Sequence, residues 1–143
     1  MLFEDVTIAV QPCAAAPKDE SPVLCFQPGQ VLLVEKESVP CLPVYRQVKP
    51  LLPEGTVLIA LLTADRQAVF TPDPLGDEVI PQGNGLSYGP MRLFREMDCR
   101  SGAVLTAAHH LWQWMRRNRF CGGCGGRMEH DGAERALRCP ACG

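Results

Sequence analysis

The sequence contains no run of about 18 apolar residues, which is the length that a membrane-spanning helix requires, although 46% of its 143 residues are hydrophobic. It also lacks the positive charge that begins a secretory signal peptide, because Glu4 and Asp5 stand near its start. No internal repeat and no low-complexity tract is found. We therefore expect a cytoplasmic protein without a membrane partner, built as one ordinary domain or as one domain with a small appendage.

The cysteines of the first hundred residues show no pairing pattern of the kind that indicates disulfides. Four cysteines stand there singly, and these are Cys13, Cys25, Cys41 and Cys99. In a reducing compartment such thiols are usually small buried side chains, and no local signature marks any of them as a nucleophile. We therefore expect them to be structural and buried.

The first hundred residues have the pattern of short strands separated by turns. Two apolar runs flank Pro28-Gly29 and two more flank residues 65–67, so each pair is predicted to form a β-hairpin. Residues 72–90 hold four prolines and four glycines, which favours an irregular loop. The expected strands are Leu2–Val10, Val23–Phe26, Val31–Glu35, Val57–Thr63 and Ala68–Thr71. They indicate a small antiparallel or mixed sheet and by themselves name no function.

A helix is predicted over Ala103–Asn118, with Ser101 as its N-cap. Apolar residues recur there at intervals of four, three and four, which places them on one helical face. They are Val104, Ala108, Leu111 and Met115. His109 and His110 lie on the flanks of the polar face without an acidic partner at helical spacing, so we expect surface or boundary histidines and not catalytic bases.

The C-terminal segment carries the strongest signal, two Cys-x2-Cys pairs separated by 14 residues. The candidate metal ligands are Cys121, Cys124, Cys139 and Cys142. Two residues between cysteines allow both thiolates to reach one ion from a tight turn, and the distance between the pairs is close to that of known zinc sites. The segments on either side of Asp131-Gly132 can pair as a hairpin. The sequence therefore predicts a zinc ribbon over residues 120–143.

Four thiolates leave no coordination position for water or substrate, so the predicted zinc is structural and not catalytic. A rubredoxin-like iron site and a redox-active Cys-x2-Cys pair are the alternatives. The short spacer and its lack of aromatic residues favour zinc, and His130 is not needed as a ligand.

The charge is unevenly distributed, although the net charge is only −2. Residues 1–111 have 8 basic and 13 acidic side chains, whereas residues 112–143 have 6 and 3. Four thiolates and one divalent cation would reduce the local charge of +3 to about +1. The basic C-terminal segment therefore compensates for the metal site, and nucleic acid is an unlikely partner.

The run LTAAHHLWQWMRRNRFCGGCGGRM, followed by CPACG, resembles the middle of the NADH pyrophosphatases of the Nudix superfamily. In that family a helix leads into a four-cysteine ribbon through a tryptophan, two basic residues, an aromatic residue and Cys-x-x-Cys-Gly. The matching residues are Trp114, Arg116, Arg117, Phe120, Cys121, Cys124 and Gly125. The resemblance is close over about 40 residues, and the first hundred residues match more loosely.

The resemblance implies an α+β fold in three parts. Residues 1–100 would form a small sheet-rich N-terminal domain with a rudimentary Nudix-like fold. Residues 101–119 would form one linking amphipathic helix, and residues 120–143 the four-cysteine zinc ribbon. The N-terminal domain would contribute to a homodimer.

The resemblance also implies a parent enzyme that hydrolyses the diphosphate of NAD(H) to a mononucleotide and AMP. The catalytic domain of that family follows the ribbon and carries the Nudix box, whose glutamates hold Mg²⁺ or Mn²⁺. No such box stands in this chain. Residues 95–103 echo the end of the box, but Cys99 and Arg100 replace its metal-binding glutamates. We therefore expect a structural, non-catalytic segment whose C-terminal Nudix domain is missing.

Two other functions remain open at this stage. One is a stand-alone zinc-ribbon module that binds nucleic acid or protein, and the other is the iron protein described above. The module hypothesis rests on the arginines of the C-terminal region. These are Arg116, Arg117, Arg119, Arg127, Arg135 and Arg138.

Overall fold

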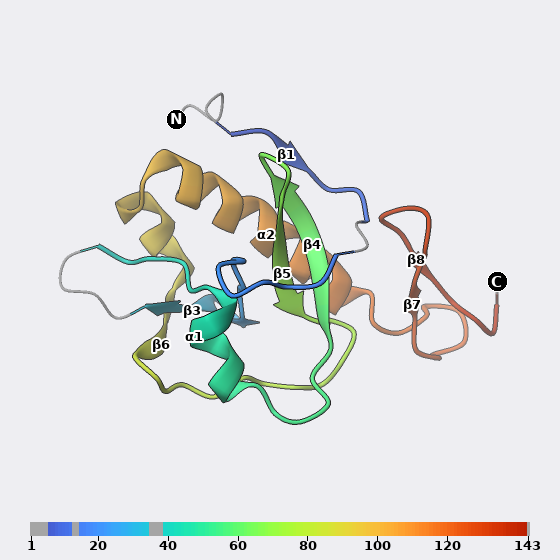
Figure 1. Cartoon of the computed structure of the whole chain (residues 1–143). Coiled ribbons are helices and arrows are strands. Elements are labelled where there is room, and N and C mark those ends of the chain that lie inside the picture. The colour runs from blue at the N-terminus through green and yellow to red at the C-terminus, as the bar shows by residue number, and fades with distance from the viewer. Residues whose placement is uncertain (1–5, 13–14, 35–38, 143) are drawn as a thin grey trace.

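The computed structural model of this protein describes residues 6–12, 15–34 and 39–142. Two small sheets and a long helix form the body of the molecule, and the C-terminal hairpin lies at one end of it (Figure 1). This arrangement confirms the expected α+β fold with one main helix and a C-terminal cysteine-rich ribbon.

The first sheet has the antiparallel order β1-β4-β5, formed by Ile8–Ala9, Leu58–Ala64 and Gln67–Pro72. The β4–β5 hairpin confirms the prediction for this region. Asp65 and Arg66 both have positive φ angles, 49° and 70°, as expected for a two-residue type I′ turn. The register shifts between Ala60 and Leu62, so β4 contains a β-bulge.

The second sheet has the order β2-β3-β6, formed by Phe26–Gln27, Gln30–Val34 and Leu86–Pro90. Its β2–β3 hairpin was predicted, and Gly29 supplies the positive φ of 71° at the turn. Strand β6 corrects the prediction of a loop over 72–90, because five of its residues pair with β3. Glycine and proline are uncommon within strands, so those in Leu86–Pro90 favoured a loop where the structure has an edge strand.

The expected first strand, Leu2–Val10, is described only from Val6 onward, where β1 covers Ile8–Ala9. Glu35, the expected last residue of another strand, also lies outside the described residues. The prediction missed three short helical segments. These are α1 at Tyr45–Val48, η1 at Lys49–Leu51 and η2 at Met91–Glu96.

Helix α2 covers Cys99–Arg117 and begins earlier than predicted. Ser101 is not its N-cap, because Asp98 holds that position and accepts a hydrogen bond from the Ser101 amide at 3.0 Å. The preceding η2 segment packs closely on the helix at Gly102, where an added Cβ would lie 2.9 Å from the Phe94 carbonyl oxygen. Glycine at this position therefore permits the sharp passage from η2 into α2.

Two hydrophobic clusters hold these elements together. The first joins α2 to both sheets and includes Leu24, Leu61 and Val69 together with Leu105 and Met115 of the helix. Helix α2 is thus part of the core of the body as well as its connection to the ribbon. The second cluster, on the other side of the strands, includes Val23, Leu32, Val48, Phe70 and Leu86.

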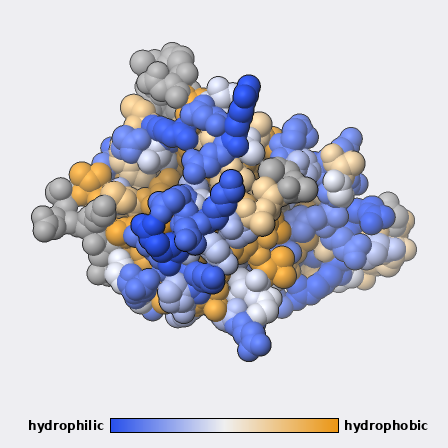
Figure 2. Space-filling view, viewed as in Figure 1, coloured by the Kyte–Doolittle hydropathy of each residue, from blue (hydrophilic) through white to orange (hydrophobic). Residues whose placement is uncertain are grey.

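The surface seen in Figure 2 is covered mostly by hydrophilic residues, with hydrophobic ones scattered between them. Among the described residues, no helix has the length and apolar character that a membrane span needs.

Candidate metal centre

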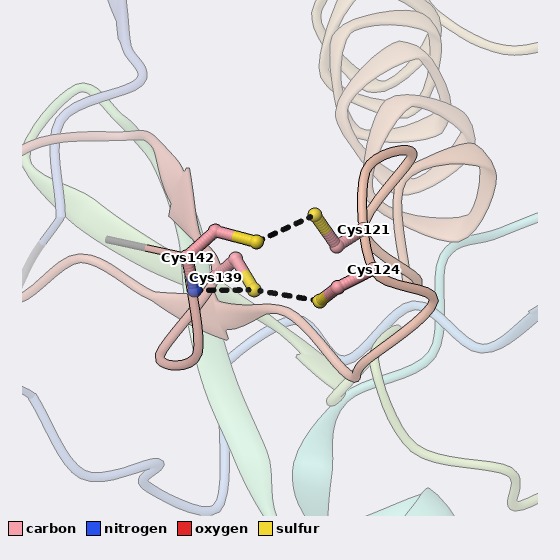
Figure 3. A group of neighbouring side chains, drawn as sticks. All are labelled: Cys121, Cys124, Cys139 and Cys142. Atoms are coloured by element: carbon pink, nitrogen blue, oxygen red, sulfur yellow. Dashed lines mark hydrogen bonds between the residues drawn. The ribbon is translucent and has the colours of Figure 1, made fainter.

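The four predicted ligands come together at the end of the molecule (Figure 3). Cys121 and Cys124 lie in the turn that follows α2, and Cys139 and Cys142 lie in the turn that follows β8 at Leu137–Arg138. Strand β8 pairs with β7 at Glu129–His130 and so brings the second turn beside the first. Their four Sγ atoms lie within 4.8 Å of one another.

The sulfur positions fit one tetrahedral zinc ion. A Zn–S bond of about 2.3 Å requires sulfur atoms about 3.8 Å apart. The Sγ atoms of Cys124 and Cys139 are 3.5 Å apart, and those of Cys121 and Cys142 are 3.9 Å apart. The ligand set consists of four soft thiols, which is the type preferred by zinc and by iron in rubredoxin-like sites.

Backbone amides point at three of these sulfurs. Gly123 N lies 3.3 Å from Cys121 Sγ, Gly126 N lies 3.4 Å from Cys124 Sγ, and Cys142 N lies 3.3 Å from Cys139 Sγ. Such N–H groups stabilise thiolate charge, because they place positive partial charge beside the sulfur. The tight turn also needs Gly125, whose φ is +76°.

A cation would allow all four thiols to be charged together. Backbone hydrogen bonds from Cys124 and Gly123 lower the pKa of Cys121 to about 6, so this thiol loses its proton readily. Hydrogen bonds with the sulfurs of Cys124, Cys139 and Cys121, followed by the negative charge of Cys121, raise the pKa of Cys142 to about 12. A divalent ion between them removes that repulsion and allows all four to be thiolates.

The ribbon has almost no hydrophobic core. Of residues 120–142, Cys139 alone is buried, with 5% of its surface exposed. In the described part of the chain, these four cysteines are also the only group of three or more potential metal ligands that lie close together.

Three side chains of the ribbon bind it to the body. Arg127 donates to the Leu75 carbonyl at 2.6 Å and contacts the Asp77 carboxylate at 2.6 Å. His130 Nε2 lies 2.8 Å from Asp73 Oδ1. Both contacts fix the loop that follows β5. The third side chain is Arg135 in the ribbon hairpin.

Arg135 binds the edge of the first sheet. Its Nη2 donates to the carbonyl oxygens of Ala60 and Leu61, each at 2.9 Å, and its Nε donates to the Val10 carbonyl at 3.0 Å. The two β4 carbonyls belong to the β-bulge, where regular pairing is interrupted. The guanidinium therefore supplies hydrogen bonds that the sheet itself lacks at this position.

The end of α2 holds the same loop after β5. Arg116 donates to the carbonyls of Pro74 and Gly76 at 3.0 and 2.7 Å, and Arg119 lies 3.4 Å from the Asp77 carboxylate. Arg138 forms a 3.7 Å ion pair with Glu129. Five of the six arginines considered for nucleic-acid binding thus have acceptors within the chain, and no pattern in the sequence indicated these contacts.

The remaining predicted positions have ordinary structural roles. His110 is exposed, and His109 is half-buried beside the rings of Phe26 and Trp112, whose centres lie 5.4 and 6.0 Å from that of the imidazole. Both are surface or boundary residues, as predicted. Burial, followed by the nearby charges of His110 and Arg117, lowers the pKa of His109.

The expectation that the four single cysteines are buried is wrong in part. Cys25 is buried, but Cys41 is half-buried and Cys99 is exposed, and Cys13 lies outside the described residues. Cys99 is exposed because it begins α2 at the surface. Its neighbour Arg100 forms an ion pair with Asp65, so the segment that echoes a Nudix box fixes the β4–β5 turn to the helix.

The contact between His130 and Asp73 should make the free energy of unfolding depend on pH. Burial raises the pKa of Asp73, but hydrogen bonds from His130 and from the Leu75 amide lower it, and the net result is a lowered pKa. A carboxylate with a depressed folded pKa adds stability above its unfolded pKa of about 3.9, and this stability is lost as the pH falls through the folded value. Asp73→Asn should therefore cost about 1 kcal/mol at pH 7.

Urea denaturation at pH values from about 2 to about 7 would measure the difference in stability between wild type and Asp73→Asn, because this range includes the unfolded pKa of the carboxyl group. The wild-type and Asp73→Asn stabilities should converge at the acid end. Glu54→Gln, at an exposed residue, is the control and should leave the curve unchanged. A constant difference between wild type and Asp73→Asn at all pH values would contradict the assignment.

The comparison with known proteins agrees with this geometry. Residues 116–143 match the family model of the NADH pyrophosphatase zinc ribbon domain. The NAD-capped RNA hydrolase NudC of Pseudomonas aeruginosa is 40% identical over 60 residues, which are 41% of this chain and 22% of that protein. NudC of Stutzerimonas stutzeri is 36% identical over 55 residues, which are 38% of this chain and 20% of that protein.

The matched segment thus spans about a fifth of the length of these relatives. The family model's match, at residues 116–143, contains the four cysteines, and the resemblance deduced from the sequence is confirmed. Residues 116–143 are therefore similar to the zinc ribbon domain of the NADH pyrophosphatases.

Proposed function

We propose that this chain is the N-terminal and zinc-ribbon portion of an NADH pyrophosphatase-like Nudix hydrolase, and that its role there is structural. The main support for a structural role is that the ribbon has a complete set of four thiols and also contacts the body through Arg127 and Arg135. The relatives are named as hydrolases of NAD-capped RNA. A parent of this type would cleave the diphosphate of NAD(H) and release a mononucleotide and AMP.

The proposed metal ligands are Cys121, Cys124, Cys139 and Cys142, which would hold one structural Zn²⁺. When bound, the ion supplies the folding energy that a ribbon without a core lacks. Mg²⁺ or Mn²⁺ would serve only the catalytic Nudix domain, because those ions require hard oxygen ligands that a tetrathiolate does not offer.

The proposed division of the chain follows the sequence prediction. Residues 1–100 form the Nudix-like N-terminal domain, residues 101–119 the linking helix and residues 120–143 the ribbon. Contacts of Arg127 and His130 with the loop after β5 support a rigid joint, because they fix the ribbon relative to the first sheet. A cytoplasmic homodimer, with the Nudix domain following in cis, completes the proposal.

The reading frame downstream of Gly143 tests this proposal. We expect a segment with the Nudix box, in which glutamates stand at the positions occupied by Cys99 and Arg100 in the echo described above. The 143-residue chain itself, incubated with NADH and Mg²⁺ or Mn²⁺, should release no AMP above the buffer background. A stop codon at this position would overturn the assignment to a larger hydrolase, and AMP release by the purified chain would overturn the structural role.

The alternative of a stand-alone nucleic-acid-binding module receives less support. A basic surface binds phosphates when its guanidinium groups are available to them. Here Arg116, Arg127 and Arg135 donate to carbonyl oxygens of the body, and Arg119 and Arg138 contact carboxylates. Binding of nucleic acid by Arg127 or Arg135 would first have to break contacts that join the ribbon to the body.

A further inference from the structure

A two-residue turn formed by Asn84 and Gly85 precedes strand β6. The Gly83 amide donates to the Leu86 carbonyl at 3.0 Å, and the Leu86 amide donates to the Gly83 carbonyl at 2.8 Å. The two central residues have positive φ angles, 51° for Asn84 and 77° for Gly85, as a type I′ turn requires. Both are exposed, so the turn presents an Asn-Gly pair to solvent.

The side chain of Asn84 joins this turn to helix α1. Its Nδ2 donates to the carbonyl oxygen of Gln47, a residue of that helix, at 2.8 Å. The residues next to the two ends of this bond, Leu86 and Val48, are both buried in the second hydrophobic cluster. The contact therefore connects two segments that contribute to the same part of the core.

The backbone amide of Gly85 is available to react with the Asn84 side chain. Within the described part of the chain this amide donates to no acceptor. A Cβ added at Gly85 would also meet no atom within 4 Å, so the space around the residue is open. Any other residue type carries a side chain that shields its amide nitrogen and restricts the backbone, whereas glycine does not. The Gly85 nitrogen can therefore approach the carbonyl carbon of the Asn84 side chain when the turn opens.

We propose that Asn84 is a site of spontaneous deamidation. The Gly85 nitrogen forms a bond to Cγ of Asn84, the bond between Cγ and Nδ2 breaks, and ammonia leaves with the proton of the Gly85 amide. Water then opens the resulting cyclic imide at either of its carbonyl groups and leaves aspartate or isoaspartate at position 84. One side-chain amide and one water are consumed, and one carboxylate and one ammonium ion are formed, so no oxidant is needed. This inference goes beyond the proposed structural role and does not depend on it.

The modification should separate the turn from α1. An ionised carboxylate has no hydrogen to donate, so it would place negative charge beside the Gln47 carbonyl oxygen in place of the present donor. Isoaspartate also adds a methylene group to the backbone, and a two-residue type I′ turn cannot contain it without a change in the pairing of Gly83 with Leu86. We therefore expect the beginning of β6 to become less protected after the reaction.

Asn118, the other asparagine of the chain, provides an internal control. It is also exposed, and its Nδ2 also donates to a backbone carbonyl, that of Trp114, at 2.7 Å. The residue that follows it is Arg119, whose side chain shields the amide that would have to attack. Asn118 should therefore remain unmodified under conditions in which Asn84 reacts.

Mass spectrometry of the full chain with its metal, incubated for several weeks at physiological temperature and slightly alkaline pH, would test the proposal. Cleavage after glutamate residues places Asn84 in peptide 79–96 and Asn118 in peptide 97–129. A fraction of peptide 79–96 that rises with time should gain about 1 Da, located at Asn84 by fragmentation, and peptide 97–129 should keep its mass. An Asn84 that stays unmodified, or equal modification of the two asparagines, would overturn the proposal.

Gly85→Ala separates the reaction from the stability of the turn. Alanine is disfavoured at a φ of 77°, so the turn of this variant should open more often, and amide hydrogen exchange of residues 83–86 should be faster. Asn84 should nevertheless react at least about 10-fold more slowly, because the added methyl group shields the attacking nitrogen. A reaction as fast as in the wild type would contradict the role of Gly85. Unchanged hydrogen exchange of residues 83–86 in the modified wild type would show that the turn stays on α1, against the proposal.

Discussion

Replacing Cys139 by serine is expected to release the metal and to unfold the ribbon. Cys139 is the one buried residue among positions 120–142, so the ribbon has no core that could keep it folded without an ion. Binding of structural zinc supplies about 10–16 kcal/mol in comparable peptides. Three thiolates hold the ion far more weakly than four, and most of that free energy is therefore lost.

Metal analysis and amide NMR would measure this effect. The wild type should contain one zinc per chain and be colourless, whereas a rubredoxin-like iron site would be red. Cys139→Ser should contain no zinc, and the amide signals of residues 120–142 should collapse to the random-coil range. Retention of both zinc and dispersed ribbon signals in Cys139→Ser would contradict the four-thiolate site.

Cys99→Ser is the matched control, because Cys99 is exposed and lies outside the cluster. It should keep the zinc and the ribbon signals. The body should stay folded in both variants, since the buried residues of its two hydrophobic clusters all lie outside residues 120–142. In Cys139→Ser the body should nevertheless lose stability, because it loses its contacts with Arg127 and Arg135 of the ribbon.

The cysteine cluster could be predicted because its chemistry is local. A segment of 24 residues contains every signal that was used, namely the two Cys-x2-Cys pairs, the glycines of the turn and the predicted hairpin between the pairs. The two hairpins of the body were predictable for the same reason, since Pro28-Gly29 and residues 65–67 each separate two apolar runs. Strand β6 was not, because its pairing with β3 joins residues more than 50 positions apart.

The contacts between ribbon and body were beyond prediction from the sequence. Arg127 reaches Leu75 across 52 positions, and Arg135 reaches Val10 across 125. An arginine near a metal site has the same appearance in a sequence whether it meets phosphate, a carboxylate or a carbonyl oxygen. The six arginines therefore suggested an exposed basic surface, whereas five of them have acceptors within the chain.

Arg135→Ala is expected to destabilise the body by about 3 kcal/mol without removing the zinc. Hydrogen bonds from a charged donor are worth more than neutral ones, and this guanidinium serves three carbonyls, of Val10, Ala60 and Leu61. Two of them lie in the β-bulge of β4, where no strand replaces the lost donor. Urea denaturation would measure the change in unfolding free energy, and amide hydrogen exchange should increase around residues 60–62.

Arg138→Ala is the matched control on the neighbouring strand. Arg138 is exposed and forms a 3.7 Å surface ion pair with Glu129. Such pairs contribute little, so the variant should lose less than about 1 kcal/mol. If Arg135→Ala were no more destabilising than Arg138→Ala, or if it lost its zinc, the guanidinium would act within the ribbon and the joint would depend on Arg127 and His130. Because the metal content and the unfolding free energy are measured separately, a weakened joint is distinguished from an unfolded ribbon.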